Sequence, residues 1–96
     1  MNDQGVFVAT DGSKYIGEFK ENLRHGDGIL KIVATGDKYT GEFEGDKSNG
    51  FGTLKLANGD VYSGYFKDGN IHGKGKYTYA NGDYYEGHFK NGFVHL

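Results

Sequence analysis

The chain repeats one short unit four times, and this repetition limits the folds open to it more than any other feature. The pattern Tyr-x-Gly-x-Phe stands at Tyr15–Phe19 and returns at Tyr39–Phe43, Tyr62–Phe66 and Tyr85–Phe89, so the tyrosines are 24, 23 and 23 residues apart. A Gly-x-Gly pair follows nine residues after the central glycine of the first three copies. Repeats of this length are typical of arrays of one supersecondary unit, so we expect every copy to form the same local structure.

Each unit carries two turn signals, which predicts a pair of short strands per unit. One signal is a glycine-containing turn such as Asn58-Gly59, and the other is a dipeptide such as Asp68-Gly69. The expected strands are Val6–Ala9, Lys14–Lys20, Arg24–Val33, Lys38–Glu44, Ser48–Ala57, Val61–Lys67, Ile71–Tyr79 and Tyr84–Lys90. The predicted fold is therefore all-β, an antiparallel meander of about eight strands that extends roughly 40 Å at roughly 4.8 Å per strand.

Turn lengths set the expected register. A two-residue loop at Asp68-Gly69 places Phe66 opposite Ile71, Gly64 opposite Gly73, and Tyr62 opposite Gly75. At the other end of the unit, a three-residue loop 57–59 with a left-handed Gly59 places Leu54 opposite Tyr62. A two-residue loop there would turn Leu54 to the other face, so the hydrophobic pattern favours three residues. The four-residue loop 33–36 absorbs an insertion, and Leu30 still meets Tyr39.

This register gathers the large apolar side chains on one face of the sheet. The face carries Tyr15, Phe19, Leu30, Ile32, Tyr39, Phe43, Leu54, Leu56, Tyr62, Phe66, Tyr77, Tyr79, Tyr85 and Phe89. The opposite face carries charged residues such as Glu18, Lys31, Glu42 and Lys55. Since no helical period and no second sheet are present to cover the apolar face, the single layer is expected to twist and curl into an elongated, concave, aromatic-lined surface.

The repeat resembles the MORN family (membrane occupation and recognition nexus), whose consensus reads roughly Y-x-G-x-[FW]-x-x-G-x-x-x-G-x-G. The resemblance covers Gly5 to His95, and the chain departs from it at Asn22, Asn49 and Leu96. It implies a single MORN-repeat domain, 1–96, with repeats at about 5–27, 28–51, 52–74 and 75–96. It also implies a scaffold that organises cytoskeletal or ciliary assemblies or targets a fused domain, with phosphoinositide and membrane attachment as a further role of the family.

Composition narrows the function. The chain has no cysteine and no proline, 18 glycines, 15 Tyr and Phe residues, and a net charge of -2. No cysteine means no disulfide framework or thiolate metal site, and the weak acidic charge argues against nucleic acid as a partner. No apolar run is long enough to cross a bilayer, and no signal-peptide pattern follows Met1. We expect a cytoplasmic protein, and the resemblance to MORN proteins implies an association with the cytoskeleton or with a membrane.

No catalytic, cofactor or metal site is expected. His25, His72 and His95 are equivalent positions of different repeats, too far apart to share a metal ion, and we expect His25 opposite Glu18 and His72 opposite Tyr65. The pair of His88 and His95 is close enough only for weak metal binding. The carboxylates of different repeats form no general acid–base pair, and the Gly-x-Gly pairs lack the helix that a phosphate-binding loop needs. The chain is therefore not expected to be an enzyme.

The aromatic face is the candidate site, because exposed aromatic surface with a polar rim marks binding regions. We expect a groove that binds an amphipathic helix or peptide of a protein partner. Its predicted residues are Tyr39, Phe43, Leu54, Leu56, Tyr62, Phe66, Tyr77, Tyr79 and Tyr85. A phosphoinositide-binding module using the lysines of the opposite face is the alternative. The terminal edge strands predict either homodimerisation or a place within a longer array.

Overall fold

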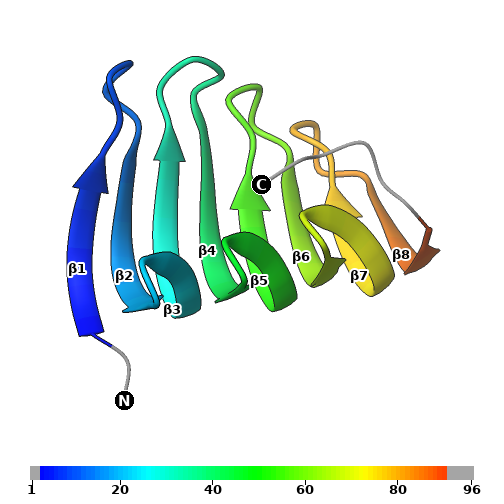
Figure 1. The fold of residues 1–96 in the computed structure, drawn as a ribbon. Coiled ribbons are helices and arrows are strands. Elements are labelled where there is room, and N and C mark those ends of the chain that lie inside the picture. The colour runs from blue at the N-terminus through cyan, green and yellow to red at the C-terminus, as the bar shows by residue number, and fades with distance from the viewer. Residues whose placement is uncertain (1–2, 91–96) are drawn as a thin grey trace.

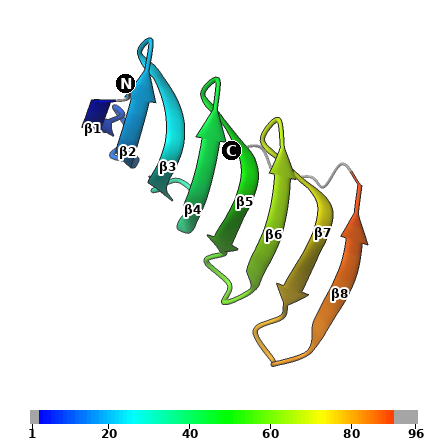
Figure 2. The ribbon, with the colours of Figure 1, turned by 90° about the horizontal axis from the view of Figure 1, so that it is seen from below.

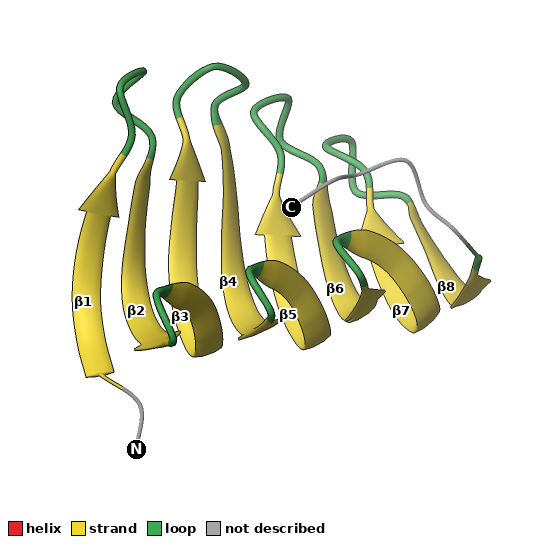
Figure 3. Cartoon of the chain, viewed as in Figure 1, coloured by secondary structure: helices red, strands yellow, loops and turns green. Residues whose placement is uncertain are grey.

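The structure is a computed structural model that describes residues 3–90. These residues form eight strands in a single sheet and the turns that join them. The strands are β1 (Asp3–Val8), β2 (Lys14–Lys20), β3 (Leu23–Ile32), β4 (Asp37–Glu44), β5 (Lys47–Lys55), β6 (Val61–Lys67), β7 (Asn70–Thr78) and β8 (Tyr84–Phe89). They pair in sequence order and antiparallel throughout (Figures 1 and 3). The predicted all-β meander is confirmed, with strand ends within three residues of those expected. Residues 3–90 contain no helix long and apolar enough to cross a membrane.

Two kinds of turn alternate along the meander. The turn between β6 and β7 has two residues, Asp68 and Gly69, both with positive φ (51° and 88°), as a type I′ hairpin requires. The turn between β5 and β6 is the predicted three-residue loop: the Leu56 N–H donates to the Asp60 carbonyl at 2.9 Å, and Gly59 has a φ of 97°. The four-residue loop 33–36 follows Ile32, which pairs with Asp37. Loop lengths therefore keep the tyrosines of all repeats on one face.

The register is as predicted at the loops and differs at the Gly-x-Gly pairs. Leu54 lies opposite Tyr62, and Phe66 lies opposite Ile71, as expected. Between them, however, Gly64 lies opposite Gly75 rather than Gly73, and Tyr62 lies opposite Tyr77 rather than Gly75. The cause is a β-bulge in which Tyr65 alone spans the three residues 72–74, with Gly73 in the left-handed region at a φ of 82°. The prediction assumed an uninterrupted ladder, and it was wrong at this point.

The bulges bring one glycine of every strand into a single row across the sheet. The row runs through Gly5, Gly17, Gly28, Gly41, Gly52, Gly64, Gly75 and Gly87, each paired with the next. A Cβ on Gly64 would lie 2.6 Å from the Lys74 carbonyl oxygen and 2.6 Å from the Tyr62 Oη, closer than real side chains allow. Glycine is needed in this row because tyrosine rings and the neighbouring backbone occupy the space of a side chain.

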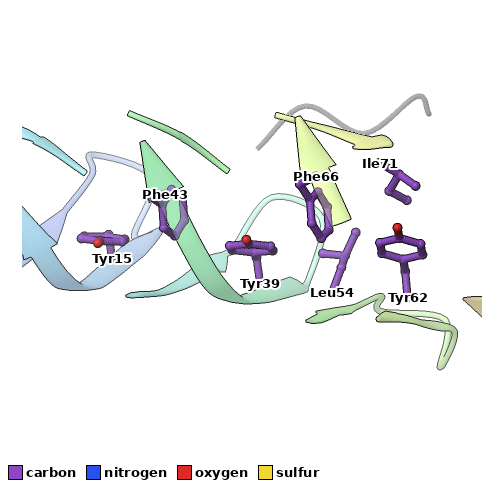
Figure 4. Close-up of a cluster of buried hydrophobic side chains, with 7 residues drawn as sticks. All are labelled: Tyr15, Tyr39, Phe43, Leu54, Tyr62, Phe66 and Ile71. Atoms are coloured by element: carbon purple, nitrogen blue, oxygen red, sulfur yellow. The ribbon is translucent and has the colours of Figure 1, made fainter. Parts of the chain in front are cut away.

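Beyond the glycine row, the two-residue hairpins curl over the inner face, which we define as the face that carries the tyrosine rings (Figures 1 and 2). The curl places Phe43, Phe66 and Phe89 each between two tyrosines, while Phe19 contacts Tyr15 at the end of the series. Phe43, for example, contacts Tyr15 and Tyr39 edge-to-face at 5.1 and 5.0 Å between ring centroids, and Phe66 continues the series against Tyr39 and Tyr62 (Figure 4). We call the resulting series the ring stack: Phe19, Tyr15, Phe43, Tyr39, Phe66, Tyr62, Phe89 and Tyr85.

The ring stack supplies the core of this one-layer protein. Tyr15, Tyr39 and Tyr62 are 0–1% exposed because phenylalanines of their own and of the next repeat cover them. Each hydroxyl donates to the carbonyl three residues on, from Tyr39 Oη to the Glu42 oxygen at 2.8 Å for example, so the buried polar atom is paired. The array measures 38 Å in its longest dimension, in agreement with the predicted length.

Candidate interaction surfaces

Five of the nine residues predicted to line a groove lie inside the core. Tyr39, Phe43, Leu54, Tyr62 and Phe66 are 0–3% exposed. Their aromatic rings form the middle of the ring stack, and Leu54 packs between Tyr39 and Tyr62 (Figure 4). These side chains offer a partner no surface unless the hairpins uncurl. Their role in the described structure is to hold neighbouring repeats together.

The other four predicted residues do present surface on the inner face. Leu56 and Tyr77 are half-buried, while Tyr79 and Tyr85 are each 48% exposed. The ring of Tyr77 lies 5.0 Å from that of Tyr79. Tyr85 lies at the end of the ring stack, where among the described residues only the Phe89 ring contacts its ring. Exposed aromatic surface of this kind is the part of the predicted site that remains open to a partner.

Two of these open positions, Leu56 and Tyr79, belong to a row in which apolar and acidic side chains alternate. Ile32 pairs with Asp37, the Leu56 N–H donates to the Asp60 carbonyl, and the Tyr79 N–H donates to the Asp83 carbonyl at 2.7 Å. We call this row the inner strip: Ile32, Asp37, Leu56, Asp60, Tyr79 and Asp83. The sequence analysis singled out its apolar members but not its aspartates. Their position two residues before each tyrosine of the repeat is the signal that could have placed them on this face.

The aspartates of the inner strip also connect the loops of successive repeats. Asp37 Oδ1 accepts from the Ala57 N–H at 2.9 Å, and Asp60 Oδ1 accepts from the Ala80 N–H at 2.8 Å. Asp60 Oδ2 additionally accepts from the Tyr77 hydroxyl at 2.8 Å. This hydroxyl, followed by the Ala80 N–H, lowers the pKa of the Asp60 carboxyl. Burial, followed by the bond to Asp60, raises the pKa of Tyr77 to about 12. Asp60 therefore carries a negative charge at neutral pH that is held in place by these hydrogen bonds.

A separate hollow of about 380 Å³ lies at the β1 end of the inner face. Its apolar floor includes Phe7, Phe19 and Leu30, and Arg24 and Asp46 stand at its rim. Arg24 Nε donates to Asp46 Oδ1 at 2.8 Å, and the guanidinium lies over the Phe43 ring at 4.9 Å. The arginine thus ties one hairpin tip to the next and caps the ring stack.

The outer face, opposite the tyrosine rings, carries the remaining titratable groups singled out from the sequence. Glu18 was expected opposite His25, but its Oε2 accepts from the Asp27 N–H at 2.8 Å, because the bulge removes a direct partner for this position. Tyr65 was expected opposite His72, and its ring instead contacts Phe51 at 5.5 Å. His95 and its predicted pairing with His88 lie outside the described residues. Within residues 3–90, no three His, Asp or Glu side chains come together as a metal site would require.

Four matches to the MORN repeat model cover most of the chain, at residues 15–32, 39–61, 62–84 and 85–95. The chain belongs to the MORN repeat family. MORN repeats form a non-enzymatic family whose members are generally modules for protein or membrane interaction. The matched segments begin at the tyrosines that build the ring stack, so the family signature in this MORN-repeat chain is mainly a signature of its core. A comparison with curated proteins found no match.

Proposed function

We propose that this MORN-repeat chain is a protein-interaction scaffold that holds an amphipathic segment of a partner, helix or peptide, against its inner strip. The observation that carries the proposal is the alternation of half-buried or exposed apolar side chains with aspartates along one row of the inner face. The ring stack buries five of the aromatic side chains of this face. The inner strip, by contrast, offers a partner exposed apolar side chains next to charged ones, as peptide-binding surfaces do.

The spacing of the strip favours a helix that crosses the strands. Ile32 ends β3, and Leu56 and Tyr79 directly follow β5 and β7, so the three positions are two strands apart, roughly 9.6 Å. Residues i and i+7 of a helix are about 10.5 Å apart along its axis, so apolar side chains at i, i+7 and i+14 would meet these three in turn. Basic residues between them would meet Asp37, Asp60 and Asp83. The partner expected is therefore an apolar and basic helix, with charge setting its register more than its affinity.

The test is affinity capture followed by direct titration of the captured partner. Wild-type chain is compared with Leu56→Arg and Tyr79→Glu, both on the inner strip, and with Lys67→Glu, an exposed position at the end of β6. Circular dichroism checks that each variant is folded. Tyr79→Glu should disturb the fold less than Leu56→Arg, because the Tyr79 side chain is half exposed. Both strip variants should weaken binding at least tenfold in calorimetry, and Lys67→Glu should leave it within about twofold.

A partner that binds wild type and both strip variants equally would contradict the proposal. Vesicles that contain phosphoinositide form a second arm of the experiment. Sedimentation with such vesicles that disappears in moderate salt, while no protein partner depends on Leu56 or Tyr79, would favour the membrane-targeting role instead. Either result would place the interaction away from the inner strip.

A further inference from the structure

Four lysines stand side by side on the outer face, one on each of four adjacent strands. Lys14 of β2 is paired with Lys31 of β3, Lys31 with Lys38 of β4, and Lys38 with Lys55 of β5. All four alternate with inward-facing tyrosine or leucine positions, so their side chains leave the same side of the sheet. We call them the lysine row. Three are exposed and Lys38 is half-buried.

Like charges placed directly opposite each other destabilise a sheet, so such a row lowers the stability of the fold. Nothing among the described residues offsets it: none of the four lysines forms an ion pair with a described carboxylate. The chain as a whole is slightly acidic, with a net charge of -2, so the row is not the result of a generally basic surface.

A neutral, partly apolar row lies directly beside the lysine row. Ile16 pairs with Ile29, Ile29 with Thr40, and Thr40 with Thr53, on the same four strands. Ile16 is 39% exposed, and together with Ile29 and Thr40 it borders a shallow depression over the glycine row. Cationic and apolar side chains therefore form two parallel rows across β2–β5.

The acidic residues of the same face lie too far away to neutralise the lysines. Glu18, Asp27 and Glu42 are each four residues along their strand from a lysine of the row, roughly 13 Å. This exceeds the screening length of about 8 Å at physiological ionic strength. An occupant of the lysine row must therefore be narrow, because a wide anionic surface would also meet these carboxylates. A flat bilayer is such a wide surface, and a single helix about 10 Å across is not.

We propose that the lysine row and its neutral neighbour form a second docking surface, for an acidic amphipathic helix of a protein partner that crosses β2–β5. Adjacent lysines are roughly 4.8 Å apart, and one turn of helix advances 5.4 Å, so acidic residues at i, i+4, i+7 and i+11 reach successive lysines. An apolar stripe next to them rests on Ile16 and Ile29. The surface is on the opposite side of the sheet from the inner strip and is independent of it.

The probe that tests this is a synthetic helical peptide with glutamates at i, i+4, i+7 and i+11 and leucines along the adjacent stripe. Its control is a peptide of identical composition whose glutamates are distributed around the helix. Fluorescence anisotropy should show that the ordered peptide binds wild type at least tenfold more tightly than the control, with affinity falling as salt rises. Amide shifts on binding should map to β2–β5 and leave the amides of β7 and β8 unchanged.

Charge reversal within the row supplies the variants. Lys31→Glu places an acid between Lys14 and Lys38, so the melting temperature should stay the same or rise while peptide affinity falls at least tenfold. Lys67→Glu makes the same charge change outside the row and should have little effect. Equal binding of the two peptides would overturn the proposal, since it would show that the lysines attract acidic peptides regardless of where the glutamates stand on the helix. Tighter binding of heparin or of anionic vesicles, also lost in Lys31→Glu, would overturn it in favour of another polyanion or a lipid surface.

Discussion

The ring of Tyr62 lies directly on the backbone of Gly75, which belongs to the neighbouring strand. A Cβ built on Gly75 would meet two carbons of this ring at 2.6 Å and its hydroxyl oxygen at 2.3 Å, and the side chain itself is fully buried. The same relationship joins Tyr15 to Gly28 and Tyr39 to Gly52. Glycine row and ring stack therefore depend on each other, and each repeat is stabilised by a contact that only glycine permits.

Gly75→Ala should destabilise the fold by about 1–3 kcal/mol or more, because the buried Tyr62 ring cannot move aside without breaking its contacts with Phe66 and Phe89. Gly87→Ala is the matched control. A Cβ there would meet the Tyr85 hydroxyl at 2.8 Å, but Tyr85 is half exposed and its ring is free to shift. Urea denaturation of both variants measures the difference, and equal losses of stability would contradict the role given to burial.

Tyr39→Phe should cost about 0.5–1.5 kcal/mol, because it removes the hydrogen bond from a buried hydroxyl to the Glu42 carbonyl while leaving the ring stack in place. The equivalent change at the exposed end, Tyr85→Phe, removes a longer bond of 3.2 Å to the His88 carbonyl and should cost less. Free energies of unfolding from chemical denaturation give the comparison. A larger effect at Tyr85 would show that the hydroxyls do not act through burial.

Glu42→Ala should loosen the bulge between β4 and β5, because Glu42 Oε2 accepts from the Phe51 N–H at 2.7 Å. Glu42→Gln keeps an oxygen able to accept the same bond and should retain most of the stability. Amide hydrogen exchange at Phe51 reports the local effect. We expect faster exchange in the alanine variant than in the glutamine variant, and identical exchange in the two would argue against this contact.

Tyr77→Phe should raise the pKa of the Asp60 carboxyl toward its ordinary value, because the Tyr77 hydroxyl is the main group that lowers it. The Asp60 pKa is depressed in the folded chain, so its contribution to stability is present at neutral pH and is lost as pH falls through the folded-state pKa. Carboxyl carbon shifts in an NMR titration follow Asp60 directly. An unchanged midpoint in the variant would rule out this bond as the cause.

The fold should lose stability between about pH 10 and pH 12. Burial raises the pKa of Tyr62 to about 12, whereas the phenol of an unfolded chain ionises near its model value of 10.0. Below pH 10 the Tyr62 phenol is protonated in both the folded and the unfolded state, and its full contribution to stability is present. Above it the unfolded state releases protons first, so stability falls until the folded state also ionises. Absorbance of tyrosinate against pH, compared between wild type and Tyr62→Phe, isolates the contribution of this phenol.

Much of the fold follows from local rules that can be applied to the sequence directly. Loop length and the two-residue alternation of a strand place Leu54 opposite Tyr62 and bring the apolar side chains to one face. The repeat then carries this arrangement through all four units. These features are decided over a few residues, so the sequence by itself determined eight strands, one sheet, and the face on which the core would form.

Tertiary structure alone decided which aromatic residues are core and which are surface. Gly73 adopts a positive φ, the alternation breaks at the bulge, and the hairpins curl over the inner face. Whether a tyrosine is buried then depends on a phenylalanine of the next repeat, as Phe66 covers Tyr39. The lysine row has the same origin, since only pairing between strands brings Lys14, Lys31, Lys38 and Lys55 together. Contacts between repeats cannot be predicted from the local sequence pattern. Each of them depends on a bend in the chain that lies some twenty residues away.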